Sequence, residues 1–192
     1  MVPPNLEKEL LSRNLPERIQ FISEYFAGEK IVFSTSFGQE DQAITQAIAS
    51  TKSNIEIFTL DTGRQFQESY ELMDLTVKKY GINLKTFFPS TPAVEKLVAE
   101  KGFNSFYTSV ENRKECCFVR KMEPLSRALK DAKVWITGLR AEQSENRADM
   151  PILEWDESRQ LFKINPLIDW DYNTLEKYLK DHKIPQNPLH KK

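Results

Sequence analysis

Cysteine is scarce in this sequence of 192 residues: it occurs twice, at the adjacent positions Cys116 and Cys117. A disulfide between neighbours in sequence would close a strained ring, and two thiols cannot form the disulfide framework of a small secreted domain. The pair therefore indicates metal binding, redox chemistry or two small apolar residues that happen to be adjacent. A reducing compartment suits this usage, because thiols there are more often ligands or catalysts than bridges.

An excess of either charge is also absent: Lys and Arg together number 27 and Asp and Glu 28, which gives a formal net charge of -1. This balance argues against nucleic acid or an anionic membrane as a partner. No stretch approaches the ~20 apolar residues of a membrane span, and the polar N-terminus lacks the apolar run of a signal peptide. We expect a cytoplasmic protein without a membrane or nucleic-acid partner.

Short apolar runs alternate with longer stretches of helical spacing. A run rich in β-branched and aromatic residues, KVWITGL (133–139), follows an amphipathic helix predicted from about Cys116 to Lys130. Such alternation predicts βαβ units, hence an α/β fold with three layers (α/β/α) around a mostly parallel sheet. We expect the 192 residues to form a single domain. Three earlier runs, each followed by a helical stretch, are KIVFSTS (30–36), IEIFTLDT (55–62) and INLKTFF (82–88).

Turn and capping signals predict the remaining segments. Two helices are expected near the N-terminus, the second beginning near Pro16, because proline is tolerated in a first helical turn. A hairpin is expected within residues 153–167, and a last helix begins with a capping Asp171 or Asn173. The final residues, NPLHKK, are expected to form a loop.

The first strand-to-helix turn, STSFGQED, places three hydroxyls and a glycine where a parallel sheet binds its ligands. Backbone N–H groups and a helix N-terminus there suit an anion. The turn is not a Walker A motif, because the Gly-Lys-Ser/Thr ending is missing. Capping of the helix by Ser34, Thr35 and Ser36 explains the hydroxyls equally well when the turn is taken alone.

Two later strands end in turns of similar character. In LDTGRQFQESY, Asp61, Thr62 and Gly63 leave a small polar surface that a ligand can approach closely. In TGLRAEQSENR, Arg140 and Arg147 follow a strand, and guanidinium groups bind oxyanions bidentately. Loop arginines are mostly solvated, but their position beside two other polar turns favours an anion-binding site.

Four motifs together resemble one family. They are SFGQED, LDTGRQFQESY, CCFVRKMEPL and ITGLRAEQSENR, in that order over almost the whole chain. The sequence resembles the adenylylsulfate and phosphoadenylylsulfate reductases, relatives of the adenine nucleotide alpha hydrolases of PP-loop type. The resemblance implies reduction of adenosine 5'-phosphosulfate, or of its 3'-phosphorylated form, to sulfite and AMP. It also implies an S-sulfocysteine intermediate with thioredoxin or glutaredoxin as reductant, and it is compatible with a homo-oligomer.

The resemblance assigns roles to individual residues. Lys121 is expected to reach the sulfonate or phosphate oxygens and to stabilise charge as the S–O bond breaks. Cys116 and Cys117 become two of four thiolate ligands of a 4Fe-4S cluster, with nearby cations offsetting the charge on the iron-bound sulfur. The substrate-binding residues that it implies are Ser34, Thr35, Ser36, Gly38, Asp61, Thr62, Gly63, Arg120, Arg140 and Arg147.

The sequence also departs from the family's pattern. It holds neither the downstream Cys-x-x-Cys that supplies the other two cluster ligands nor the Glu-Cys-Gly-x-His motif that carries the nucleophile. We therefore expect residues 1–192 to be a nucleotide-binding reductase domain truncated before its catalytic segment, inactive alone and with a cluster that is under-ligated. Position 113 is arginine, where many relatives have histidine.

Two other functions stay open at this point. One is an ATP-using PP-loop relative, such as a sulfate adenylyltransferase subunit, although those enzymes resemble Ser-x-Gly-Gly-x-Asp-Ser where this chain has Ser36-Phe37-Gly38-Gln39. The other is a nucleotide-binding or iron-sulfur module without catalysis. The preference for a substrate with or without a 3'-phosphate is also open, because the sequence does not identify the cation that would bind this phosphate. Lys52 and Arg64 are among the basic residues available.

Overall fold

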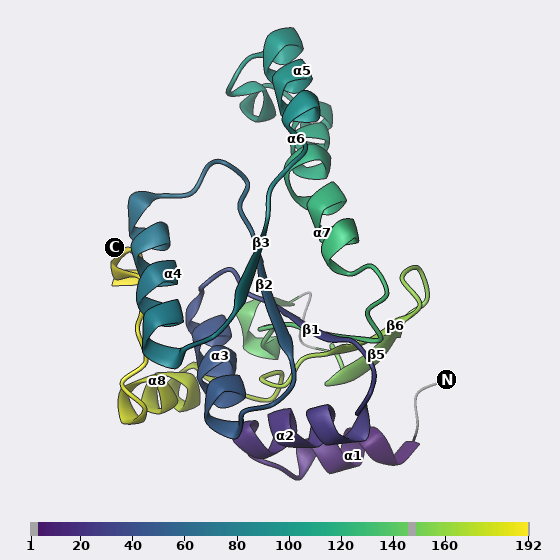
Figure 1. Ribbon diagram of the computed structural model, residues 1–192, viewed down its shortest axis with the longest axis vertical. Coiled ribbons are helices and arrows are strands. Elements are labelled where there is room, and N and C mark those ends of the chain that lie inside the picture. The colour runs from purple at the N-terminus through teal and green to yellow at the C-terminus, as the bar shows by residue number, and fades with distance from the viewer. Residues whose placement is uncertain (1–3, 146–148, 192) are drawn as a thin grey trace.

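The computed structural model describes residues 4–145 and 149–191, and its centre is a six-stranded sheet in the order β3-β2-β1-β4-β6-β5 (Figure 1). All neighbouring strands run parallel except β5, which pairs antiparallel with β6. The mostly parallel sheet and the hairpin are therefore confirmed. The strands are β1 (Ile31–Ser34), β2 (Glu56–Leu60), β3 (Leu84–Phe87), β4 (Val134–Ile136), β5 (Leu153–Asp156) and β6 (Leu161–Ile164).

Helices cover both faces of this sheet, which confirms the three-layer architecture. Successive side chains of a strand point to opposite faces, and β1 shows this clearly. Ile31 and Phe33 pack in one core with residues of α1, α2, α3 and α8, whereas Val32 packs in a second core with Phe58 and with Leu129 at the end of α7. The helices are α1 (Pro4–Leu11), α2 (Leu15–Tyr25), α3 (Gln39–Thr51), α4 (Gln67–Tyr80), α5 (Thr91–Lys101), α6 (Val110–Cys117), α7 (Glu123–Ala128) and α8 (Tyr172–Asp181).

Capping side chains fix the starts of α2 and α8, near Pro16 and at one of the two predicted caps, Asp171. Asn14 caps α2 by accepting a hydrogen bond from the Glu17 amide, with Pro16 in the first turn. Asp171 caps α8 by accepting from the Thr174 amide at 2.7 Å. The prediction of a loop for NPLHKK is wrong at Pro188–Lys191, which forms a 3-10 turn that begins after Asn187, whose side chain accepts from the Leu189 amide at 2.9 Å.

The helix predicted from about Cys116 to Lys130 is a second correction. Helix α6 begins earlier, at Val110, because Ser109 caps it by accepting from the Asn112 amide. A π-helical turn, Phe118–Met122, then separates α6 from α7. Pro124 gives the physical reason, because proline has no N–H for the carbonyl four residues earlier and its ring clashes with that carbonyl; the wider turn relieves the conflict.

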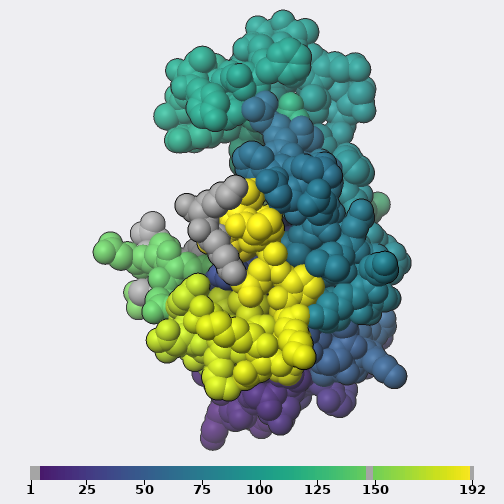
Figure 2. Space-filling model, turned by 90° about the vertical axis from the view of Figure 1, so that its left-hand side faces the viewer, coloured from purple at the N-terminus to yellow at the C-terminus, as the bar shows by residue number. Residues whose placement is uncertain are grey.

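Helices α5 and α6 and the 3-10 turn Ser105–Tyr107 between them form an arm, residues 91–117, that extends away from the sheet (Figure 1). The space-filling view shows the arm standing out from the body at one end of the molecule (Figure 2). Helix α6 has no buried residue, and Leu97 is the one buried residue of α5, so the arm buries few side chains. Within the described ranges, no helix has the length and apolar character needed to span a membrane.

Candidate functional site

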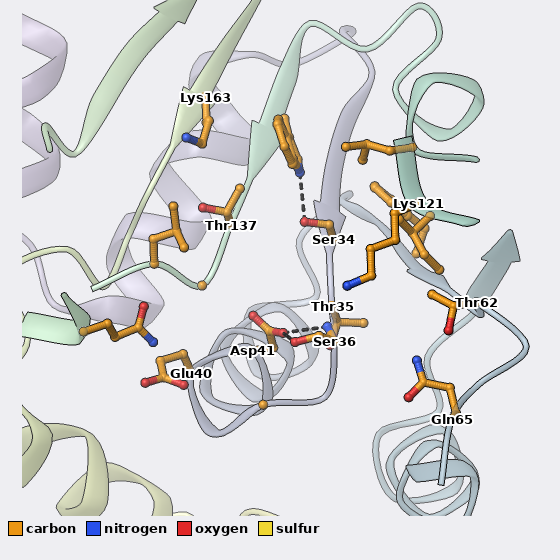
Figure 3. A pocket seen from close by; sticks show the side chains of 18 residues that line it. Ser34, Thr35, Ser36, Glu40, Asp41, Thr62, Gln65, Lys121, Thr137 and Lys163 are labelled. Carbon is orange, nitrogen blue, oxygen red and sulfur yellow. Dashed lines mark hydrogen bonds between the residues drawn. The ribbon is translucent and has the colours of Figure 1, made fainter. Parts of the chain in front are cut away.

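The turns that follow β1, β2 and β4 meet around one cavity of about 550 Å³ at the carboxyl edge of the sheet (Figure 3). Parallel strands bring their carboxyl ends to the same edge, so turns far apart in sequence become neighbours. The size suits a small-molecule ligand such as a nucleotide. The lining residues are Ser34, Thr35, Ser36, Gly38, Glu40, Asp41, Phe58, Leu60, Thr62, Gln65, Lys121, Leu125, Trp135, Thr137, Gly138, Leu139, Gln143 and Lys163.

One part of the lining is apolar and comes from one face of the sheet and from α7, which packs on that face. It includes Phe58, Leu60, Leu125 and Trp135. The Trp135 indole N–H donates to the Ser34 hydroxyl at 2.9 Å, which orients the ring and occupies one of the predicted site hydroxyls (Figure 3). The cavity therefore joins an apolar surface, suited to a nucleobase, to a polar turn suited to an anion.

The turn after β1 has an unusual backbone conformation at Phe37, whose φ is +61°. A bulky residue adopts this left-handed conformation rarely, so surrounding contacts must hold it. The Phe37 ring is buried against Leu72 and Met73 of α4, and its amide donates to the Thr35 hydroxyl at 3.0 Å. Core packing thus shapes the turn that presents Thr35, Ser36 and Gly38 to the cavity.

Asp41, in the first helical turn of α3, stabilises the turn after β1 by hydrogen bonds. Its carboxylate accepts from the Ser36 amide at 2.6 Å and from the Ser36 hydroxyl at 2.7 Å. Burial is the main cause that raises the pKa of Asp41 to about 6, opposed by the Ser36 hydrogen bonds. Gly138, after β4, lies so close that a Cβ there would be 2.1 Å from the Asp41 Oδ1 atom. Asp41 therefore sets the spacing between the first and third turns.

The LDTG turn after β2 is organised by Asp61, which is buried and does not line the cavity. Its carboxylate accepts from the Gly63 amide and from the Tyr70 hydroxyl, each at 2.8 Å. The bond to Asp61 is the main cause that raises the pKa of Tyr70. Gly63 has φ +70°, a conformation that favours glycine. Asp61 and Gly63 shape the turn, and Thr62 is the member that lines the cavity.

The two predicted arginines of the third turn have different outcomes. Arg140 is buried and forms ion pairs with Glu40 and Glu142, each at 2.9 Å, and it does not line the cavity. Two carboxylates compensate its charge, so its contacts in this structure hold the turn to α3. Arg147 lies outside the described residues.

Lys121 and Arg120 are adjacent in the π-helical turn but point to different places. Lys121 lines the cavity, and its side chain runs toward the turn that carries Thr35 and Ser36 (Figure 3). Arg120 is buried and donates to the Thr62 carbonyl at 2.6 Å. Lys121 therefore lies where it could reach a ligand in the cavity, and its contact with an anion stays a prediction.

Cys116 is half-buried and Cys117 exposed at the end of α6. Their exposure argues against the reading of the pair as small core residues. Among the described residues, no group of three or more His, Cys, Asp or Glu side chains could hold a metal ion. A 4Fe-4S cluster takes four ligands, so the part of the chain that is described supplies two thiols and no complete donor set.

The cavity also contains residues that the sequence did not single out. Asp41 and Gly138 stand inside motifs already recognised, so their motifs could have flagged them. Trp135 and Lys163 lie on adjacent strands, paired in register across β4 and β6, and no local pattern joins them. Lys163 pairs with Glu154 at 2.6 Å, with its ammonium 5.9 Å from the Trp135 ring centre.

Neither cation considered for a 3'-phosphate lines this cavity. Lys52 ends α3 in a left-handed conformation, between α3 and β2, so it stands at the opposite edge of the sheet from the site. Arg64 donates to the carbonyl of Phe103 at 3.0 Å and to the side chain of Asn104 at 3.1 Å. Both contacts are in the arm.

Comparison with known proteins gives consistent results. The family described as "Phosphoadenosine phosphosulfate reductase domain" matches residues 30–192. The chain is 44% identical over 188 residues to an adenosine 5'-phosphosulfate reductase of Agrobacterium fabrum, which covers 98% of this chain and 72% of the relative. Other relatives with this name are 41–50% identical, and the chain spans 61–74% of their length.

Solved structures agree on the fold. A phosphoadenylyl-sulfate reductase from Candida auris, in a phosphate complex, superposes with a TM-score of 0.81 at 25% identity, covering 100% of this chain and 92% of that one. An NH3-dependent NAD synthetase from Campylobacter jejuni superposes with a TM-score of 0.61 at 12% identity, covering 98% and 78%. The second likeness concerns the fold alone and agrees with the PP-loop-type architecture.

Proposed function

The chain belongs to the phosphoadenosine phosphosulfate reductase domain family, and we propose that it binds the substrate in an enzyme that reduces adenosine 5'-phosphosulfate to sulfite and AMP. A sulfur-group oxidoreductase is the class to which its relatives belong. The observation that carries the substrate assignment is Lys121, which points into a cavity lined by all three of the polar turns that the sequence predicted.

The two halves of the cavity suggest the pose of the nucleotide. The adenine ring would lie against the half-buried side chains of Leu60, Leu125 and Trp135, which offer apolar contact area. The phosphosulfate would lie at the turn containing Ser36 and Gly38, near the N-terminus of α3. Both donors of Ser36 already bind Asp41, so the α3 N-terminus and Lys121 are the groups that we assign to the anion.

The proposed chemistry has two steps. A cysteine thiolate attacks the sulfur of the phosphosulfate, the S–O bond breaks, and AMP leaves while an S-sulfocysteine forms on the enzyme. A dithiol protein, thioredoxin or glutaredoxin, then becomes a disulfide as sulfite is released and the cysteine is regenerated. Lys121 would stabilise the charge that develops on the leaving phosphate. We place the attacking cysteine outside residues 1–192, and the cytoplasm is the compartment that we propose for these thiols.

Cys116 and Cys117 are proposed as half of the donor set of a 4Fe-4S cluster. The described residues do not complete that set, so no step of the reduction is assigned to the cluster. The iron and acid-labile sulfide content of a longer form of the protein, purified without air, tests the proposal. A colourless protein that turns over at full rate would remove the cluster from the mechanism.

Calorimetry on this chain tests the substrate assignment. AMP, adenosine 5'-phosphosulfate, its 3'-phosphorylated form and ATP are titrated separately. We expect Lys121→Gln to weaken binding of adenosine 5'-phosphosulfate about tenfold or more, the loss of one charged hydrogen bond. Lys114→Gln removes the same charge from an exposed position of α6 and should leave binding unchanged. Selective tight binding of ATP would favour an ATP-using relative instead.

Turnover separates substrate binding from catalysis. With thioredoxin present, this chain should bind adenosine 5'-phosphosulfate and release no sulfite beyond background. Repeated turnovers by residues 1–192 would contradict the assignment of the nucleophile to a position outside them. Binding without turnover even in a longer form of the protein would favour a nucleotide-binding module.

A further inference from the structure

Arg120 differs from the other buried arginines near the core. It is 9% exposed, and among the residues that the structure describes it has no carboxylate partner. By contrast, Arg18 pairs with Asp169 at 2.6 Å, and Arg140 pairs with Glu40 at 2.9 Å. Burying a cation without an opposite charge costs folding free energy, so the contacts that Arg120 does make are expected to have a function. Arg120 is not among the residues that line the cavity.

The contact that Arg120 does make is with the LDTG turn. Its Nη1 atom donates to the Thr62 carbonyl at 2.6 Å, and a Cβ on Gly63 would be 3.4 Å from that same nitrogen. The backbone of Thr62 and Gly63 therefore lies directly on the guanidinium. Thr62 also lines the cavity. One residue of the turn thus meets the nucleotide site on one side and Arg120 on the other.

The sequence position of Arg120 links this turn to the cysteines. Arg120 is three residues after Cys117, within the π-helical turn that continues α6. A wide turn of this kind alters the directions of successive side chains relative to an α-helix. Arg120 consequently reaches the LDTG turn while Lys121 enters the cavity.

A second arginine joins the same turn to the far part of the arm. Arg64 donates to the Phe103 carbonyl and to the Asn104 side chain, at 3.0 and 3.1 Å. Within the arm, Lys101 at the end of α5 pairs with Glu115, next to the cysteines. The LDTG segment is therefore bonded to the chain before α6, through Arg64, and to the π-helical turn after Cys117, through Arg120.

We infer that Arg120 is a positioning residue that couples the nucleotide-binding LDTG turn to the cysteine segment through the Thr62 carbonyl. The inference rests on the proposed function in one respect, that a nucleotide occupies the cavity. Ligand contact with Thr62 would reduce the mobility of the turn. Through its hydrogen bond to the Thr62 carbonyl, Arg120 would then also reduce the mobility of the segment carrying Cys116 and Cys117. By linkage, the state of the thiols would affect nucleotide affinity by the same factor.

Thiol alkylation of the reduced, iron-free chain measures the coupling. Iodoacetamide rates at Cys116 and Cys117 are followed by peptide mass spectrometry with and without saturating AMP. We expect AMP to slow alkylation about fivefold or more, the lower end of typical coupling between two sites. Arg120→Gln should abolish this effect of AMP, and Arg120→Lys, which keeps one donor and the charge, should restore part of it.

Arg113→Gln is the matched control. Arg113 is exposed and lies three residues before the pair, as Arg120 lies three residues after it. Its replacement removes the same charge near the thiols without touching the LDTG turn, so the effect of AMP should persist. If Arg120→Gln unfolds the chain, Arg64→Ala tests the same coupling from the solvent-exposed contact and should reduce the effect of AMP.

Two outcomes would overturn the coupling. One is nucleotide binding, shown by calorimetry, with thiol rates that do not respond to it. The other is an undiminished response in a folded Arg120→Gln variant, which would mean that the nucleotide shields the thiols directly. Absence of nucleotide binding in the unmodified chain would instead contradict the proposed function, so the two failures are distinguishable.

Discussion

The edge of the sheet and the arm both belong to the proposed site, but different forces hold them. The turns at the sheet edge are attached to strands whose side chains are fully buried, such as Phe33 and Phe58. The arm exposes large apolar side chains, with Phe103 74% and Tyr107 80% accessible, and polar contacts attach it to the LDTG turn. Local stability follows buried apolar contacts, so the nucleotide turns are expected to be more rigid than the cysteine segment.

The largest expected difference between the two regions is in the loss of unfolding free energy when one aromatic ring is removed from each. Phe33→Ala should lower the free energy of unfolding by about 3–5 kcal/mol, because it leaves a cavity in the core beneath β1. Phe103→Ala should change it by less than about 0.5 kcal/mol, as expected for an exposed position. Urea unfolding of both variants gives the comparison. Equal losses would mean that the arm carries as much of the global stability as the sheet.

A pH effect should be specific to the sheet edge. The pKa of Asp41 is raised in the folded protein from its ordinary value of 3.8 to about 6, chiefly by burial. Between these values the folded state binds the extra proton, so the contribution of Asp41 to stability is present below about pH 4 and is lost as pH rises through about 6. The loss should total about 2–3 kcal/mol.

Comparison with Asp41→Asn isolates this contribution. The free energy of unfolding is measured from pH 4 to pH 7 in both proteins, and their difference cancels the titration of other groups. Glu40 contributes to the shift as a neighbouring charge, and the cavity also holds Lys121 and Lys163. A difference that stays constant with pH would contradict a raised pKa at Asp41.

A smaller effect should follow from adding one methyl group between the first and third turns. Gly138→Ala would place its Cβ 2.1 Å from the Asp41 Oδ1 atom, so one of the two turns must move. We expect a loss of about 1–3 kcal/mol in unfolding free energy together with weaker binding of AMP.

Gly38→Ala is the control for that change. A Cβ there meets its nearest neighbour at 3.7 Å, an ordinary contact, and its φ of -65° is accessible to alanine. Gly38 is the N-cap of α3, where alanine is less favourable than glycine, so the unfolding free energy of this variant should fall by no more than about 1 kcal/mol. If Gly138→Ala behaved in the same way, the contact between Asp41 and the third turn would not set the spacing of the site.

Local pattern predicted most of the fold and part of the site. Apolar runs located the strands, turn signals located the hairpin, and the capping residue at Asp171 was correct. The helix through Cys116 was predicted with the wrong start and without its π-helical turn, since the effect of Pro124 depends on how the preceding turn is hydrogen-bonded. Of the residues assigned to the substrate, Ser34, Thr35, Ser36, Gly38 and Thr62 line the cavity, together with Lys121.

The sequence alone determined the alternation of strands and helices, the three polar turns and the family, because each is a local arrangement of residue types. Tertiary structure decided which residues meet: Glu40 with Arg140, Asp41 with Gly138, Arg120 with the Thr62 carbonyl, and Lys163 with Trp135. Most of these pairs join residues far apart in the chain. Their contact depends on the order of the strands and on the direction of each helix, and no short stretch of sequence encodes either.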